Sequence, residues 1–124
     1  NPCVVLDATG GASGGREESF VRFYRERLPG LRPITWNAQN KGQMVGSLRL
    51  LLEQKRFLIP QEFAATIDQM KCYRYKRAEM SHWVTYGAPN GQHDDHVSAA
   101  MMAAKAIDEN WVPTGSGMGL GAIL

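Results

Sequence analysis

Two acidic segments of this sequence could hold a divalent metal ion. The first, Gln92-His93-Asp94-Asp95-His96, places four titratable side chains in succession at the predicted start of a helix. A single Asp there is an ordinary helix cap, but a second carboxylate gains nothing as a cap, because adjacent like charges repel unless a cation holds them. On a helical wheel Asp94 lies beside the apolar stripe, whereas Asp95 points nearly opposite, toward solvent. We therefore expect Asp94 to face the rest of the fold.

The second acidic position is Asp7, between the apolar run Cys3–Leu6 and the glycine-rich loop ATGGASGG. The run predicts a buried strand, and sites in open α/β sheets form beyond the C-terminal ends of the parallel strands. An Asx turn that opens the loop is the alternative role for Asp7. The loop lacks the Lys-Ser/Thr ending of a phosphate-binding loop, so nucleotide binding is disfavoured.

Carboxylates on two separate elements suit Mg²⁺ or Mn²⁺, and His93 or His96 suits Mn²⁺ or the outer shell of such a site. Two ions roughly 3.5–4 Å apart can activate water and stabilise the leaving oxygen in phosphodiester hydrolysis. A third acid is normally needed. The remaining candidates lie on predicted helices far from strand ends and are expected to be surface residues: Glu53, Glu62 and Asp68.

A basic segment interleaved with tyrosines could contact nucleic acid. Residues 72–86 alternate in polarity and predict a hairpin that turns near residues 79–81. Alternation sends Tyr73, Tyr75 and Arg77 to one face. A charged edge strand that resists aggregation is the alternative interpretation. The cations suit phosphates and predict sequence-independent binding: Lys71, Arg74, Lys76 and Arg77.

The remaining patterns predict an α/β fold. Apolar runs indicate strands at 3–6 and 33–36, and helical spacing indicates a helix from Glu17 to Leu28 between them, which together make a βαβ unit. A capping box of Asn40 and Gln43 predicts a helix over 41–55, followed by an extended segment at 57–60. Shorter and longer helices are expected near 63–70 and over 93–110. The tryptophans, Trp36 among them, are interpreted as core residues.

Composition limits the possible classes of protein. The chain has 124 residues, 44% of them hydrophobic, and a formal net charge of +2, which excludes a histone-like polycation. No apolar stretch approaches 18 residues, and two cysteines are too few for a disulfide scaffold. We expect one domain over 1–112 and a glycine-rich tail or linker over 113–124. The first residue is Asn1, so the chain is expected to be a piece of a longer polypeptide.

Several segments, taken in order, match a known family between about residues 3 and 110. They are VVLDATGG, ITWNAQNK, KRFLIP and YGAPNGQHDDHVSAAMMAAKA. An HDD element followed by a helix of small residues is fairly specific to RNase H-like nucleases. With LDATG at this separation, the chain resembles the C-terminal nuclease domain of the large terminase subunit of tailed bacteriophages. The resemblance implies an RNase H-like three-layer fold, with a C-terminal helix after the HDD motif.

The resemblance also implies roles for particular residues. Asp7 is similar in position to the second metal-binding acid, at the end of the fourth strand of that fold, and Asp94 to the last one. Asp95 is a neighbour that shares a metal, and Lys41 is placed near DNA. The family's first metal-binding Asp, with its strand and two partner strands, would precede Asn1, so the fold and the site are expected to be partial.

The implied activity is two-metal endonuclease cleavage of concatemeric viral DNA with Mg²⁺ or Mn²⁺. The implied partners are double-stranded viral DNA, an ATPase motor domain, the portal and the small terminase subunit, without a membrane. The expected location is the cytoplasm of a host bacterium, at the capsid. Two alternatives remain open: a RuvC-like resolvase or transposase core, and a catalytically incomplete DNA-binding remnant.

Overall fold

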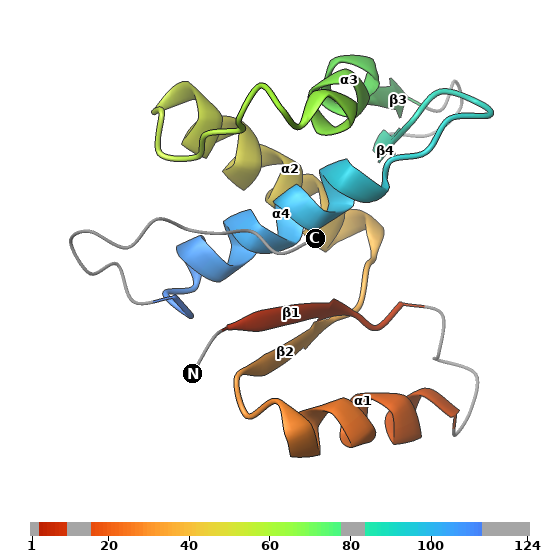
Figure 1. The fold of residues 1–124 in the computed structure, drawn as a ribbon. Helices are drawn as coiled ribbons and strands as arrows, with labels where there is room; N and C mark the ends of the chain where they lie inside the picture. Colours follow the sequence, from red (N-terminus) through yellow and green to blue (C-terminus); the bar gives the residue numbers. More distant parts are fainter. Residues whose placement is uncertain (1–2, 10–15, 78–83, 113–124) are drawn as a thin grey trace.

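Four helices and two small sheets make up the residues that this computed structural model describes, which are 3–9, 16–77 and 84–112 (Figure 1). The glycine-rich loop after Thr9, the predicted hairpin turn and the predicted tail over 113–124 lie outside the described residues. In chain order the elements are β1 Val4–Asp7, α1 Arg16–Arg27, β2 Leu31–Ile34, α2 Ala38–Glu53, α3 Ala64–Cys72, β3 Arg74–Arg77, β4 Val84–Gly87 and α4 Asp95–Asp108.

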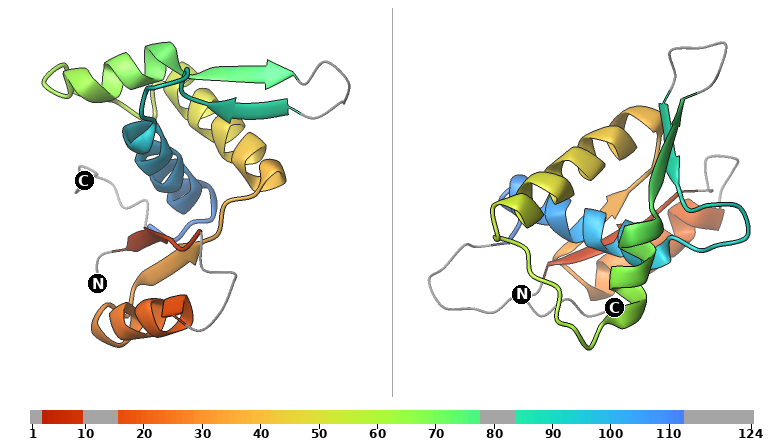
Figure 2. Two further views of the ribbon diagram at one scale, coloured as in Figure 1. Left: turned by 90° about the vertical axis from the view of Figure 1, so that its right-hand side faces the viewer. Right: turned by 90° about the horizontal axis from the view of Figure 1, so that it is seen from above.

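The first sheet is the predicted βαβ unit. β1 pairs with β2 in parallel, in a register that sets Val4 opposite Leu31 and Asp7 opposite Ile34. The sheet lies between α1 on one face and α2 with α4 on the other (Figures 1 and 2). β2 begins two residues earlier than predicted, because Leu31 is itself buried against the fold. β2 also ends two residues earlier than predicted, so Thr35 and Trp36 lie in the connection to α2.

α2 begins earlier than the sequence predicted, and the predicted capping box of Asn40 with Gln43 is wrong. Asn37 is the N-cap, and its side chain accepts from the Asn40 N–H at 2.8 Å while the Asn40 side chain accepts from the Asn37 N–H at 2.9 Å. The Asn40 amide also donates to the Thr35 carbonyl at 2.6 Å. These bonds stabilise a start one turn earlier. As a result Lys41 lies in the first turn of α2, close to the end of the parallel sheet.

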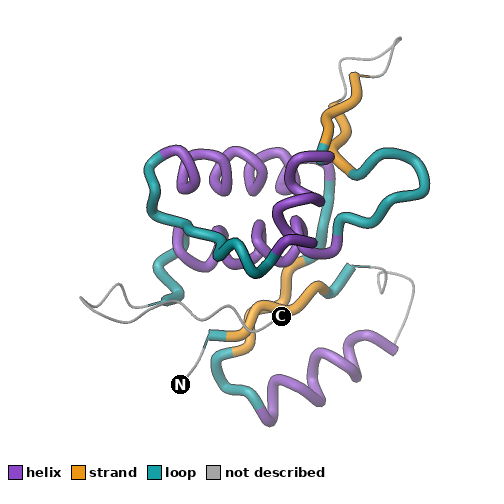
Figure 3. The backbone as a smooth tube through the Cα atoms, turned by 45° about the horizontal axis from the view of Figure 1, so that its top comes forward, coloured by secondary structure: helices purple, strands orange, loops and turns teal. Residues whose placement is uncertain are grey.

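The core forms where α2 packs against α4, two helices that run side by side in Figure 3. Met101 and Ala104 of α4 are fully buried, and Met44 and Leu51 of α2 are 2% exposed. These positions recur at helical spacing, which is why the apolar stripes of the two helices could be identified in the sequence. None of the helices in the described ranges is long and apolar enough to cross a membrane.

The segment expected to be extended at 57–60 forms no strand among the described residues. Lys55 adopts a left-handed conformation with φ 55°, and the N–H groups of Arg56 and Phe57 both donate to the Leu51 carbonyl. This arrangement is a helix C-terminal motif. The two N–H groups end α2 by bonding to its last turn, so they do not pair with a neighbouring strand. Phe57 then packs against the core, and Leu58 is exposed.

The predicted hairpin is confirmed as an antiparallel pair, β3 with β4, which sets Arg74 opposite Gly87 and Tyr75 opposite Tyr86. It projects away from the helices (Figures 2 and 3). The two tyrosines before and within β3 have different surroundings, because Tyr73 ends α3 and packs against the core whereas Tyr75 is 70% exposed. Alternation alone did not indicate this difference, since it depends on how far the hairpin extends beyond the core.

We expect Met101→Ala to destabilise the fold by about 2–5 kcal/mol, because truncating a fully buried Met removes apolar contacts and leaves a cavity. Urea unfolding followed by circular dichroism measures this change. Leu50→Ala is the control on the facing helix, at a position 53% exposed, and should cost less than about 1 kcal/mol. Equal costs at the two positions would contradict a core between α2 and α4.

Candidate metal centre

A cleft of about 380 Å³ opens where β1 ends and where α2 and α4 begin. Asp7 reaches it because the carboxyl end of β1 points toward this edge, and Asp94 reaches it because it immediately precedes α4. The structure therefore brings the two acids selected from the sequence to the same cleft. The full lining is Asp7, Thr9, Trp36, Lys41, Asp94, Asp95, Ser98 and Met102.

Asp7 makes the Asx turn that was its alternative role. Its Oδ1 accepts from the Thr9 N–H at 2.8 Å, and the Thr9 hydroxyl accepts from the Trp36 N–H at 2.8 Å. The Ala8 N–H donates to the Ile34 carbonyl at 2.8 Å, which continues the parallel pairing past the end of β1. These bonds fix the Asp7 side chain at the mouth of the cleft. One carboxylate oxygen in an Asx turn is compatible with a ligand role, because a carboxylate has two oxygens.

Asp94 is at the N-cap position of α4, but its side chain makes no capping hydrogen bond. Its backbone conformation, φ −129° and ψ 20°, differs from the extended form that capping side chains favour. Its Oδ2 lies 3.9 Å from Lys41 Nζ and 3.8 Å from where a Cβ on Gly87 would stand. The capping role considered for Asp94 is thus not performed by this carboxylate, which faces a cation in the cleft instead.

Asp95 is exposed, as the helical wheel predicts, yet it also lines the cleft. Ser98 and Met102, three and seven residues further along α4, share that lining, so one edge of α4 faces the cleft. The prediction that Asp95 points toward solvent is therefore confirmed, and its exposed side chain lies at the edge of the cleft. The wheel placed Asp95 relative to the buried stripe of α4 and carried no information about the sheet end beside it.

The two histidines of the motif are placed differently. His93 is exposed and does not belong to the cleft lining. His96 faces α3, where its Nδ1 lies 2.8 Å from the Thr66 hydroxyl oxygen and its backbone N–H donates to Gln69 Oε1 at 2.9 Å. Thr66 is buried, so this contact joins α3 to α4. The role of His96 in the structure is to hold the helix that presents Asp94 and Asp95.

Tyr73, which the sequence pattern placed in the basic hairpin, lies outside the cleft lining and lines a separate apolar pocket with Val45, Met70 and Met101. Its hydroxyl oxygen is buried and has no hydrogen-bond partner among the described residues. Burial, followed by the negative charge of Asp94 and by Tyr86, raises the pKa of Tyr73 to about 12. The phenol therefore stays protonated and able to donate throughout the neutral range. No local pattern marks this position, since its surroundings come from three separate elements.

The structure describes the side chains of only some of the predicted DNA-binding cations. Lys41 is in the cleft, and Arg74 is exposed at the base of the hairpin, where its guanidinium donates to the Lys71 carbonyl at 2.9 Å. The strand β3 includes Lys76 and Arg77, but their side chains lie outside the described ones.

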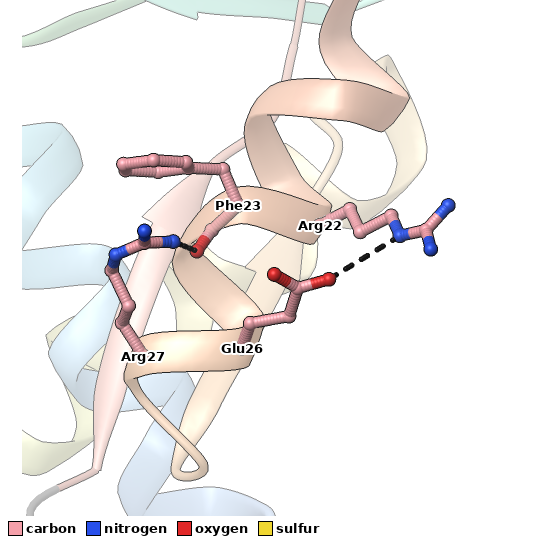
Figure 4. A network of polar contacts seen from close by, with 4 residues as sticks. All are labelled: Arg22, Phe23, Glu26 and Arg27. Carbon is pink, nitrogen blue, oxygen red and sulfur yellow. Dashed lines mark hydrogen bonds and ion pairs between the residues drawn. The ribbon is translucent and has the colours of Figure 1, made fainter.

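Two arginines of α1, Arg22 and Arg27, are less suitable for binding DNA, because their contacts lie within the helix (Figure 4). Arg22 Nε is 3.4 Å from Glu26 Oε1, and the Arg27 guanidinium lies 3.7 Å from the Phe23 ring centroid. Arg27 also donates to the Phe23 carbonyl at 3.0 Å. These side chains are thus partly neutralised or stacked on their own helix.

The donor chemistry of the cleft fits a hard divalent cation, because Asp7, Asp94 and Asp95 supply carboxylate oxygens. Within residues 3–9, 16–77 and 84–112, however, no three His, Cys, Asp or Glu side chains are grouped closely enough to hold an ion. The other acids considered lie outside the cleft lining, since Glu53 pairs with Arg49 at 2.8 Å and Glu62 and Asp68 are exposed. Comparisons of the chain with protein-family models, with curated proteins and with solved structures find no match.

Proposed function

We propose that this chain is part of a metal-dependent DNA endonuclease of RNase H-like fold, of the kind found in the large terminase subunits of tailed phages. The observation that carries the proposal is that Asp7 and Asp94, from distant parts of the sequence, line the same cleft. Lys41, in the first turn of α2, lines this cleft as well and lies close to Asp94. The parallel sheet with helices on both faces is compatible with this fold. The resemblance of the sequence motifs supplies the reaction class.

In this proposal Asp7 and Asp94 bind a Mg²⁺ or Mn²⁺ ion, and Asp95 adds a ligand at the exposed edge of α4. The metal, when bound, activates water and stabilises the negative charge that develops during phosphodiester hydrolysis. Lys41 contributes a positive charge in the cleft that suits a phosphate group of the DNA. Two-metal cleavage requires a further acid, which the terminase resemblance assigns to a strand preceding those described.

The proposed substrate is double-stranded viral DNA, and the proposed partners are an ATPase motor domain, the portal and the small terminase subunit. Exposed cations at the base of the β3–β4 hairpin favour phosphate contacts that do not depend on base sequence. A catalytically incomplete DNA-binding remnant is the second candidate. It is favoured by the exposed side chains of Lys71 and Arg74 at the base of the hairpin, which suit phosphate groups without a metal ion.

Metal binding separates these candidates, because an ion that binds only the folded state stabilises it. At a free Mn²⁺ concentration about ten times Kd, the gain is about 1.4 kcal/mol, which corresponds to a Tm increase of about 5 °C. Asp7→Asn and Asp94→Asn should each remove most of this increase in differential scanning fluorimetry.

The matched control is Asp68→Asn, an exposed acid on α3 that does not line the cleft and should leave the Mn²⁺ effect unchanged. An equal Mn²⁺ effect in the Asp94→Asn and Asp68→Asn variants would show that the ion binds elsewhere. No increase in the wild-type protein at millimolar Mn²⁺ would favour the DNA-binding remnant.

A further inference from the structure

The end of β4 lies between α2 and the residue that precedes α4. On one face of the strand, Tyr86 Cε2 lies 3.6 Å from where a Cβ on Gly42 of α2 would stand. On the other face, a Cβ on Gly87 would stand 3.8 Å from Asp94 Oδ2, in the lining of the cleft. Successive residues of a strand face opposite sides, so the face of the hairpin that carries Gly87 borders the cleft.

Arg74 belongs to the same face of the hairpin as Gly87. The two residues are directly opposite one another in the antiparallel register, whereas Tyr75 pairs with Tyr86 on the other face. Because the Cβ positions of opposite residues are about 4.5–5.5 Å apart, the Arg74 Cβ lies within about 9 Å of Asp94 Oδ2. The phosphates of one DNA strand follow one another about every 3.4 Å of helix axis. A strand that reaches Asp94 therefore carries neighbouring phosphates past Arg74.

The Arg74 guanidinium is held in place and still has donors for a ligand. Its Nη1 donates to the Lys71 carbonyl at 2.9 Å and to the Tyr73 carbonyl at 3.4 Å. Neither bond uses Nε or Nη2, and the exposed side chain makes no ion pair with an acid among the described residues. A guanidinium edge of this kind binds phosphate through two parallel hydrogen bonds.

Gly87 leaves the backbone uncovered between Asp94 and Arg74. The backbone does not require glycine here, since Gly91 is the glycine with a positive φ among the described residues. A Cβ at 3.8 Å from Asp94 Oδ2 would make an ordinary van der Waals contact, so the fold has room for a side chain. Glycine within a strand is typical of a place where a ligand or another chain approaches the backbone closely.

We propose that Gly87 and Arg74 form a phosphate subsite beside the cleft, in which the DNA backbone crosses Gly87 and the Arg74 guanidinium binds a phosphodiester group. The inference rests on the proposed function for DNA as the ligand, but the subsite itself needs no metal ion. The segment from Gln69 to Ala78 contains four cations and no acid, which fits a polyanion. Because the contact is to the backbone, the subsite acts on all base sequences alike.

The affinity for duplex DNA, measured by fluorescence anisotropy in Ca²⁺ at several salt concentrations, tests the role of the cation. Arg74→Gln should raise the Kd about five- to tenfold and lower the slope of log Kd against log salt by about 0.9, the value for one phosphate contact. Arg74→Lys keeps the charge and should restore the slope. Arg49→Gln, which removes an exposed cation of α2, should change neither quantity. A guanidinium that only caps the carbonyl groups of α3 leaves the slope unchanged in Arg74→Gln, and that result overturns the subsite.

A double-mutant cycle tests the place of Gly87. Gly87→Val fills the space beside Asp94 and should weaken DNA binding, and Arg74→Gln should then cause little further loss, because the backbone no longer reaches Arg74. Gly87→Ala, which fits the fold at ordinary contact distance, should cause a smaller loss. Gly46→Ala is the control, since nothing lies within 4 Å of a Cβ added there. Losses that simply add in the double variant contradict the subsite.

The Mn²⁺ thermal shift separates failure of the subsite from failure of the proposed function. Arg74→Gln should leave this shift unchanged, because Arg74 does not line the cleft. A Mn²⁺ shift in the wild type together with additive losses overturns the subsite and leaves the proposed function standing. Coupled losses without a Mn²⁺ shift support the subsite, overturn the nuclease and assign the phosphate contact to a DNA-binding remnant.

Discussion

Asp94→Asn is expected to lower Mn²⁺-dependent nicking of supercoiled DNA about 10²–10³-fold in a chain that carries the complete set of metal ligands. The substitution keeps the size of the side chain but removes the negative charge that faces the cleft. Asp7→Asn should have an effect of the same order, because its carboxylate lines the same cleft from the end of β1. A plasmid nicking assay with Mg²⁺ and with Mn²⁺ measures both rates.

The assay is best run on two lengths of the protein. The proposed two-metal reaction needs a further acid, which the proposed terminase relationship assigns to earlier strands, so we expect the 124-residue chain to cut very slowly or not at all. A version extended through those strands should cut, and Asp68→Asn should leave its rate unchanged. If the 124-residue chain nicks DNA efficiently and Asp94→Asn abolishes that activity, the assignment of a missing first acid is wrong.

Much of the fold can be predicted from the sequence because its signals are local. The apolar run before Asp7, the helical stripes that include Met44 and Met101, and the alternating segment before Gly87 all identify their elements. Boundaries are less accurate where two local signals compete. Asn37 and Asn40 are both good caps, and only the bonds that join them at the end of β2 decide between them.

The candidate site is predictable to the extent that it depends on topology. Parallel strands end at a common edge of their sheet, and this rule alone is enough to place Asp7 where a functional site can form. The rest depends on packing between elements. Trp36 is predicted to be a core residue but also lines the cleft, and the contact between Lys41 and Asp94 joins two helices whose relative position no local pattern encodes.

The contact of Lys41 with Asp94 leads to a prediction with two effects of opposite sign. Lys41 Nζ is 3.9 Å from Asp94 Oδ2, and the two side chains are 27% and 30% exposed. A partly exposed pair of this kind contributes at most about 1 kcal/mol. Lys41→Gln removes a cation that competes with the metal for Asp94, so it should tighten Mn²⁺ binding by up to about fivefold.

The same substitution should slow DNA cleavage by the extended chain about 100-fold, because the cleft loses the positive charge that suits a phosphate. Arg49→Gln is the control on α2, where the cation is 78% exposed and pairs with Glu53 at 2.8 Å; it should change neither quantity. Damage to the fold would weaken Mn²⁺ binding and cleavage together, so tighter binding with slower cleavage identifies a cation that acts on the substrate. If Lys41→Gln lowers both the Mn²⁺ affinity and the cleavage rate, the lysine supports the structure of the cleft. If the substitution changes neither quantity, the DNA does not approach the metal from the side of α2.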